Sequence, residues 1–137
     1  MVKLFAGEKG EGKTKKLIQM ANSALETSDG NIVYIDDDGR NIHELKYKIR
    51  LVNTADYPPK TYNEFIAFVY GMLSQNSDIS NIYIDSLSGV IEGIDSKNVE
   101  KTLVQLENIA KNHKIEFFVT LNCNPNELTD EAKKYLA

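Results

Sequence analysis

The N-terminal segment constrains the fold most, because a short apolar run leads directly into a glycine-rich loop and then into a helix. Residues 2–6 are mostly apolar and have the length of a strand, and Gly7, Gly10 and Gly12 follow within six positions. Beyond Gly12, apolar residues recur at helical spacing: Leu17, Ile18, Ala21, Ala24 and Leu25. A buried strand, a flexible loop and an amphipathic helix are therefore expected in this order.

The rest of the chain alternates apolar runs with helical patterns. Strands are predicted at residues 2–6, 32–35, 49–53, 82–84 and 115–121. Helices are predicted from about residue 12, and at 42–47, 62–73, around 99–110 and at 127–136. This alternation predicts an α/β fold, a three-layer sandwich with a mostly parallel, roughly five-stranded sheet. No linker or repeat divides the chain, so residues 1–137 are interpreted as one domain.

Composition limits the possible partners and locations. The 137 residues carry a formal net charge of −4, which does not support a nucleic-acid partner. The single cysteine, Cys123, permits no intrachain disulfide and fits a reducing compartment. No apolar run reaches the roughly 18 residues of a membrane span, and the N-terminal apolar segment is too short for a signal peptide. A cytoplasmic protein with no membrane association is expected.

The glycine-rich loop has the sequence of a phosphate-binding motif. Residues 7–14 match the pattern G-x-x-x-x-G-K-[ST] in full. The glycines let backbone N–H groups turn toward an anion, and the following helix adds its positive N-terminal end. The Lys13 ammonium can reach the β- and γ-phosphates, and the Thr14 hydroxyl can ligate Mg²⁺. The motif predicts binding of a nucleoside triphosphate, ATP with Mg²⁺, and we expect these residues to contact it: Gly7, Glu8, Lys9, Gly10, Glu11, Gly12, Lys13, Thr14 and Lys15.

Acidic residues follow two of the predicted strands. Asp85 comes directly after the run at 82–84, where a carboxylate can face the loop and hold Mg²⁺ indirectly, for example through a bound water, opposite Thr14. Residues 36–38 are all aspartate and follow the run at 32–35. They are either a solvated strand end with a helix-capping residue, or the source of a base that orients an attacking water. The residues alone leave both interpretations open.

The order of these features resembles the RecA-like ATPases, a branch of the P-loop NTPases. The resemblance spans about residues 1–125 and includes Asp85-Ser86 at the second acidic strand end and Asn122 at the last. It implies that Asp38 is the catalytic carboxylate and that Asn122 senses the γ-phosphate, with Lys13 as the third catalytic group. Family members usually have Glu and Gln at the positions of Asp38 and Asn122, so the shorter side chains imply slow hydrolysis. The chain also resembles small single-domain ATP-binding proteins of bacteria.

Three functions are compatible with these patterns. The leading one is Mg²⁺-dependent ATP hydrolysis with low intrinsic turnover. The first alternative is a nucleotide-dependent switch with negligible hydrolysis that acts on a protein partner or assembles as a homo-oligomer. The second is a small nucleoside-type kinase, whereas a GTPase is disfavoured because no Asn-Lys-x-Asp motif is present. Arg40, one of only two arginines, is expected to pair with the aspartate cluster, and Glu8 and Glu11 are expected to point outward.

Overall fold

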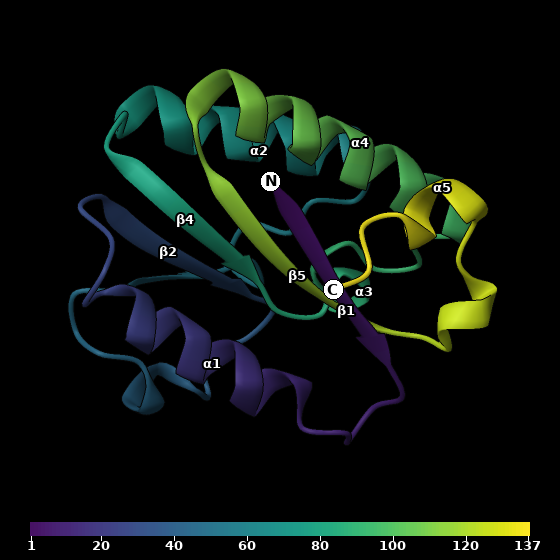
Figure 1. Ribbon diagram of the computed structural model, residues 1–137, viewed down its shortest axis with the longest axis horizontal. Coiled ribbons are helices and arrows are strands. Elements are labelled where there is room, and N and C mark those ends of the chain that lie inside the picture. The colour runs from purple at the N-terminus through teal and green to yellow at the C-terminus, as the bar shows by residue number, and fades with distance from the viewer.

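A parallel sheet forms the centre of the protein, and the computed structural model describes all residues, 1–137. Its strands are β1 (Val2–Gly7), β2 (Asn31–Asp36), β3 (Arg50–Asn53), β4 (Ile79–Ile84) and β5 (Glu116–Asn122). They lie in the order β1-β5-β4-β2-β3, and every neighbouring pair is parallel. The predicted α/β class and five-stranded parallel sheet are therefore confirmed. Because β5 lies between β1 and β4, the ends of these three strands are brought side by side (Figure 1).

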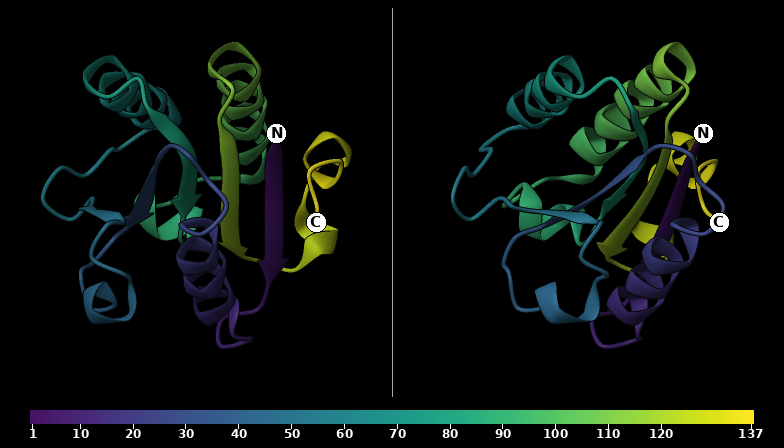
Figure 2. Two further views of the ribbon diagram at one scale, coloured as in Figure 1. Left: turned by 60° about the vertical axis from the view of Figure 1, so that its left-hand side comes forward. Right: turned by 90° about the vertical axis from the view of Figure 1, so that its left-hand side faces the viewer.

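Helices cover both faces of the sheet (Figure 2). Helix α1 (Lys13–Ala24) lies on one face, and α2 (Tyr62–Gln75) and α4 (Ser96–His113) lie on the other (Figure 1). The layers are held by two separate apolar clusters, a larger one beneath α2 and α4 and a smaller one beneath α1. The smaller cluster contains Leu17, Ile18 and Ala21, the buried stripe that helical spacing predicts for α1. The arrangement fits a three-layer sandwich.

The short elements differ most from prediction. Residues 42–47 contain only a 3₁₀ turn, η1 (Ile42–Glu44), and a helical turn not predicted, α3 (Leu87–Val90), follows β4. The helix predicted at 127–136 is reduced to η2 (Pro125–Glu127) and α5 (Asp130–Lys133). Its C-terminal part instead extends beside β1, where the Leu4 N–H donates to the Tyr135 carbonyl at 2.8 Å and the Ala137 N–H donates to the Leu4 carbonyl at 2.9 Å. These bonds cover the free edge of β1.

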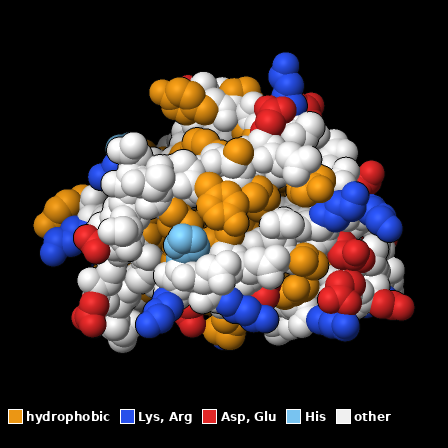
Figure 3. All heavy atoms as spheres, turned by 90° about the horizontal axis from the view of Figure 1, so that it is seen from above, with side chains coloured by type: hydrophobic (Ala, Val, Ile, Leu, Met, Phe, Trp, Pro, Cys, Tyr) orange, Lys and Arg blue, Asp and Glu red, His pale blue; other side chains and the backbone are white.

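The face over α2 and α4 carries hydrophobic side chains beside a histidine, with charged groups toward its margins (Figure 3). Tyr70 of α2 and His113 of α4 meet there edge to face, with ring centroids 6.5 Å apart. This contact joins the two helices at the surface. None of the helices combines the length and apolar composition needed to cross a membrane.

Candidate functional site

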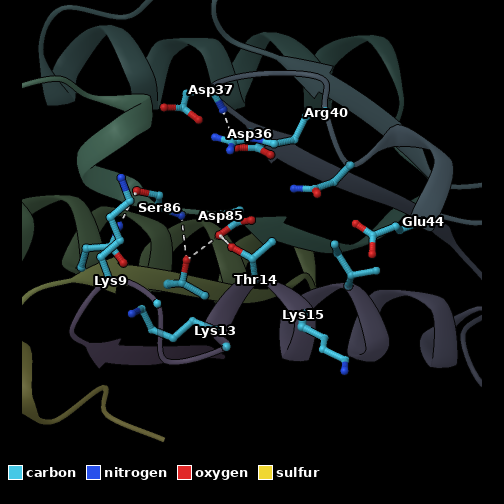
Figure 4. Close-up of a pocket in the computed structure, with 16 residues that line it drawn as sticks. Lys9, Lys13, Thr14, Lys15, Asp36, Asp37, Arg40, Glu44, Asp85 and Ser86 are labelled. Atoms are coloured by element: carbon cyan, nitrogen blue, oxygen red, sulfur yellow. Dashed lines mark hydrogen bonds between the residues drawn. The ribbon is translucent and has the colours of Figure 1, made fainter.

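A cavity of about 580 Å³ opens at the carboxyl ends of the strands, between the glycine-rich loop and the segments after β2 and β4 (Figure 4). Sixteen residues line it, and Ile18 is the only hydrophobic one among them, so the cavity suits a polar ligand. Ligands of open α/β folds bind in the same place, outside the carboxyl ends of parallel strands. The lining comes from the loop and α1, from β2 and the segment after it, from the end of β4, and from β5.

The start of α1 leaves backbone donors free at one side of this cavity. A side chain caps each of α2, α3, α4 and α5, whereas α1 begins after Gly12 with no side-chain cap. Gly10 and Gly12 have φ angles of 91° and 81°, in the left-handed region that glycine adopts without strain. The uncapped N–H groups and the positive end of α1 together form an environment that favours an anion.

Not every residue of the loop faces the cavity. Lys9, Gly10, Gly12, Lys13, Thr14 and Lys15 line it. Gly7, Glu8 and Glu11 do not, although all three are expected from the sequence to contact the ligand. Both glutamates are exposed, as their expected outward direction requires, and the Glu11 carboxylate lies over Gly7. In Figure 4 the ammonium group of Lys15 points away from Asp85.

Lys13 is held against the loop that precedes it. Its Nζ donates to the Gly7 carbonyl oxygen at 3.0 Å and to the Glu8 carbonyl oxygen at 2.6 Å. Because these acceptors are neutral, the positive charge of Lys13 has no anionic partner within the chain. The ammonium group lies beside the uncapped start of α1, and its charge adds to that of the helix end.

Asp85 is a buried carboxylate, 4% exposed, directly after β4. Its Oδ1 accepts hydrogen bonds from Thr14 Oγ1 at 3.1 Å and from Thr120 Oγ1 at 2.9 Å. Its Oδ2 accepts one from Tyr34 OH at 2.9 Å. No Lys or Arg forms an ion pair with it, so hydroxyl groups alone offset the cost of burying this carboxylate. The predicted proximity of Thr14 and Asp85 is confirmed.

The residues around Asp85 fit a magnesium ion. No group of three or more His, Cys, Asp or Glu side chains surrounds a common point, so no all-protein cage for a metal is present. Mg²⁺ is usually bound instead through one or two carboxylates together with phosphate oxygens and water. A buried carboxylate without a cation, next to a threonine hydroxyl and an anion-favouring helix end, provides the protein part of such a site.

The turn after β4 connects Asp85 with the end of β5. Ser86 has a φ of 60° and a ψ of 82°, a strained conformation for a residue that is not glycine. Its N–H donates to Thr120 Oγ1 at 2.7 Å, and its Oγ accepts from Asn122 Nδ2 at 3.4 Å. Asn122, predicted as a sensor of the ligand, thus lines the cavity and contacts the turn that carries Asp85.

The three aspartates at the end of β2 and directly after it have different environments. Asp36 is 5% exposed and lines the cavity, and its Oδ1 accepts from the Asp37 N–H at 2.7 Å. Burial, together with the neighbouring Asp37 and Asp85 carboxyl groups, raises the pKa of Asp36 to about 7. Asp37 also lines the cavity, and its carboxylate lies so close to Gly89 that a Cβ there would be 2.5 Å from Oδ2.

Asp38, the carboxylate that the resemblance marks as catalytic, does not line the cavity. Its Oδ2 lies 2.7 Å from Arg40 Nη2 and 2.9 Å from Arg40 Nε, and its Oδ1 accepts from the Arg40 N–H at 3.0 Å. These hydrogen bonds hold the pKa of Asp38 below its usual range. The expected pairing of Arg40 with the aspartate cluster is confirmed, and its partner in the cluster is the one aspartate that does not line the cavity.

Tyr34 and Thr120 are the functional residues that the sequence analysis missed. Both lie within the apolar runs at 32–35 and 115–121, from which strands are predicted. A signal for Thr120 was present: side chains of a strand alternate between faces, so Thr120 lies on the same face as Asn122. Tyr34 has no comparable signal, because its contact with Asp85 depends on the pairing of β2 with β4.

Comparison with known proteins adds no assignment. No protein-family model matches the chain, and no curated protein matches it.

Proposed function

We propose that the protein binds Mg²⁺–ATP in the cavity and hydrolyses it slowly, as a small RecA-like P-loop NTPase. The observation that carries this proposal is the hydrogen bond between Thr14 and Asp85, which joins the uncapped start of α1 to a buried carboxylate without a cation. A nucleoside triphosphate with a divalent ion can bind both of these groups at once. Its phosphates accept hydrogen bonds from the N–H groups of α1, and its metal ion binds the carboxylate.

In this proposal the loop holds the phosphates. The backbone N–H groups of residues 10–14 and the Lys13 ammonium group bind the β- and γ-phosphates. Thr14 Oγ1 and Asp85 hold Mg²⁺, which supplies charge neutralisation at the phosphates when bound. Lys9 also lines the cavity and forms no hydrogen bond or ion pair through its Nζ. Its charge is available to the terminal phosphate, whereas Arg40 is engaged by Asp38.

Hydrolysis also needs a side chain that orients the attacking water. Asp37 fits this role better than Asp38, because Asp37 lines the cavity beside the turn of Ser86 while Asp38 is bound to Arg40. Asn122 lies next to the same turn and can donate to a γ-phosphate oxygen. Asp36 is buried between Asp37 and the proposed metal site at Asp85. Once deprotonated, it favours a bound cation by its negative charge.

A nucleotide-dependent switch with negligible turnover is the second candidate. The observation that favours it is the engagement of Arg40 with Asp38, because Arg40 is the arginine that lines the cavity and could otherwise stabilise charge in the transition state. Hydrolysis measured at saturating Mg²⁺–ATP separates the two candidates, since a switch binds ATP and leaves it intact.

Calorimetric titration of Mg²⁺–ATP into the wild type and into Lys13→Ala tests nucleotide binding. Lys13→Ala is expected to abolish binding, because it removes the unpaired positive charge beside the start of α1. Lys15→Ala is the matched control: it removes the same charge from the same turn, but the Lys15 ammonium group points away from Asp85 (Figure 4). Equal affinity of wild type and Lys13→Ala would refute the proposal.

A further inference from the structure

The second oxygen of Asp85 is held by a tyrosine from the neighbouring strand. Tyr34 OH donates to Asp85 Oδ2 at 2.9 Å, and the two residues lie in β2 and directly after β4. The other oxygen, Oδ1, accepts hydrogen bonds from the hydroxyl groups of Thr14 and Thr120. Donors from three different elements therefore determine the orientation of this one carboxylate.

Tyr34 is buried, and its hydroxyl group has a single hydrogen-bond partner. It is fully buried, and its ring lies beside that of Tyr83 with centroids 6.4 Å apart and planes inclined by 16°. Its hydroxyl forms a hydrogen bond with Asp85 and with no other group. Burial and the nearby Asp85 carboxylate raise the pKa of Tyr34 above its usual range, so the phenol keeps its proton and acts as the donor.

We infer that Tyr34 is a positioning residue for the divalent cation, acting through Asp85 and not through the ligand. Tyr34 does not line the cavity, so it cannot touch a bound nucleotide or metal directly. By holding Oδ2 in the core it leaves Oδ1 turned toward Thr14. Groups that orient a metal-binding side chain typically change metal affinity by about 10- to 100-fold when removed. This inference rests on the proposed Mg²⁺–nucleotide site.

Tyr34→Phe provides the direct test, because it removes one oxygen and keeps the ring. The measurement is the Mg²⁺ concentration that gives half-maximal binding of ATP at a fixed ATP concentration. We expect this concentration to rise on the order of tenfold in Tyr34→Phe. ATP binding measured in EDTA should be unchanged, because the loop contacts do not involve Tyr34. An unchanged Mg²⁺ midpoint would overturn the inference.

Tyr83→Phe is the matched control. Tyr83 is also buried, lies on the adjacent strand and stacks on both Tyr34 and Phe118. Its hydroxyl contacts only Asn81 and the Met20 carbonyl oxygen, both at 3.4 Å. Loss of this oxygen perturbs the same aromatic core without touching Asp85, so the Mg²⁺ midpoint should stay at the wild-type value. A shift equal to that of Tyr34→Phe would show a general packing effect and overturn the inference.

Combination with Asp85→Asn tests whether Tyr34 acts through Asp85. Tyr34→Phe should have no further effect on the Mg²⁺ midpoint in the Asp85→Asn background, and an undiminished effect there would contradict the inference.

A measurement on the wild type covers the case in which Tyr34→Phe does not fold. In protein labelled with ¹³C at tyrosine Cζ, Mg²⁺ added to the ATP complex should shift the Tyr34 resonance and leave that of Tyr83 in place. A stationary Tyr34 resonance overturns the inference, and a wild type that binds no Mg²⁺–ATP refutes both this inference and the proposed function.

Discussion

Thr14 Oγ1 donates a hydrogen bond to Asp85 Oδ1 at 3.1 Å, across 71 positions of the chain. The contact joins the first turn of α1 to the carboxyl end of β4. It forms because β5 alone separates β1 from β4 in the sheet, and α1, which follows β1, packs against β5. With the two oxygens 3.1 Å apart, one cation can contact both.

Thr14→Val should selectively weaken the Mg²⁺-dependent part of ATP binding. Valine keeps the shape of the side chain but removes the oxygen that faces Asp85, so we expect the affinity for Mg²⁺–ATP to fall by about tenfold or more. Thr14→Ser retains the hydroxyl and should bind nearly as well as the wild type. Titrations with Mg²⁺ and with EDTA measure the effect, and an equal loss under both conditions would contradict a metal-binding role.

The stability of the nucleotide-free protein should fall as the pH rises from about 4 to 7. Asp36 has a pKa of about 7 in the folded chain against 3.8 as its ordinary value. Between these values the folded state holds a proton that the unfolded state has released, so the free energy of unfolding decreases with pH. When the folded and unfolded states differ by one full proton, the free energy of unfolding changes by about 1.4 kcal/mol per pH unit, and this is the upper limit of the slope.

Asp36→Asn isolates this contribution. Its amide oxygen can still accept from the Asp37 N–H, but the group no longer titrates, so the pH dependence between 5 and 7 should flatten and the variant should exceed the wild type in stability near pH 8. Urea unfolding at several pH values measures this pH dependence of the free energy of unfolding. Asp38→Asn is the control, because Arg40 holds the pKa of Asp38 below its ordinary value and this carboxyl does not titrate in that window. If Asp36→Asn kept the wild-type slope of unfolding free energy against pH, the assignment of this slope to Asp36 would be contradicted.

The aspartates after β2 should contribute unequally to hydrolysis. Asp37→Asn is expected to lower kcat by about 100-fold, the usual minimum for loss of a catalytic carboxylate, with little change in ATP affinity. Asp38→Asn should stay within a few-fold of the wild type, because its carboxylate is bound by Arg40 outside the cavity. Steady-state phosphate release measures both. The reverse order would restore Asp38 to the role that the resemblance implies.

Gly89→Ala should impair hydrolysis by displacing Asp37. The added Cβ would lie 2.5 Å from Asp37 Oδ2 and 3.2 Å from Ser86 Oγ, so the carboxylate must move away from the turn. Gly71→Ala is the matched control on α2, where an added Cβ meets nothing within 4 Å. It should leave hydrolysis unchanged and raise stability by up to about 1 kcal/mol, because alanine favours the helix over glycine. Thermal unfolding and phosphate release distinguish the two, and normal turnover in Gly89→Ala would exclude a role for this arrangement of Asp37.

Local pattern was sufficient for the main elements of the fold. The five strands and the helices α1, α2 and α4 follow from apolar periodicity, because each must bury one face or stripe and the pattern records which. The short elements were predicted poorly, since a single turn carries too few residues for a period. The extent of α5 was also beyond local pattern, because residues 135–137 bond to β1, far away in the sequence.

For the site, the sequence by itself determined the glycine-rich loop, Lys13, Thr14 and the presence of carboxylates at strand ends. These depend on residue type and short spacing, which a chain displays directly. Only the tertiary structure decided which carboxylates face the cavity. Asp36, Asp37 and Asp38 are chemically identical, and the turn that binds Asp38 to Arg40 separates them. The tertiary structure also decided that Tyr34 supports Asp85. These residues are 51 positions apart in the sequence, and the pairing of β2 with β4 brings the phenol within hydrogen-bonding distance of the carboxylate.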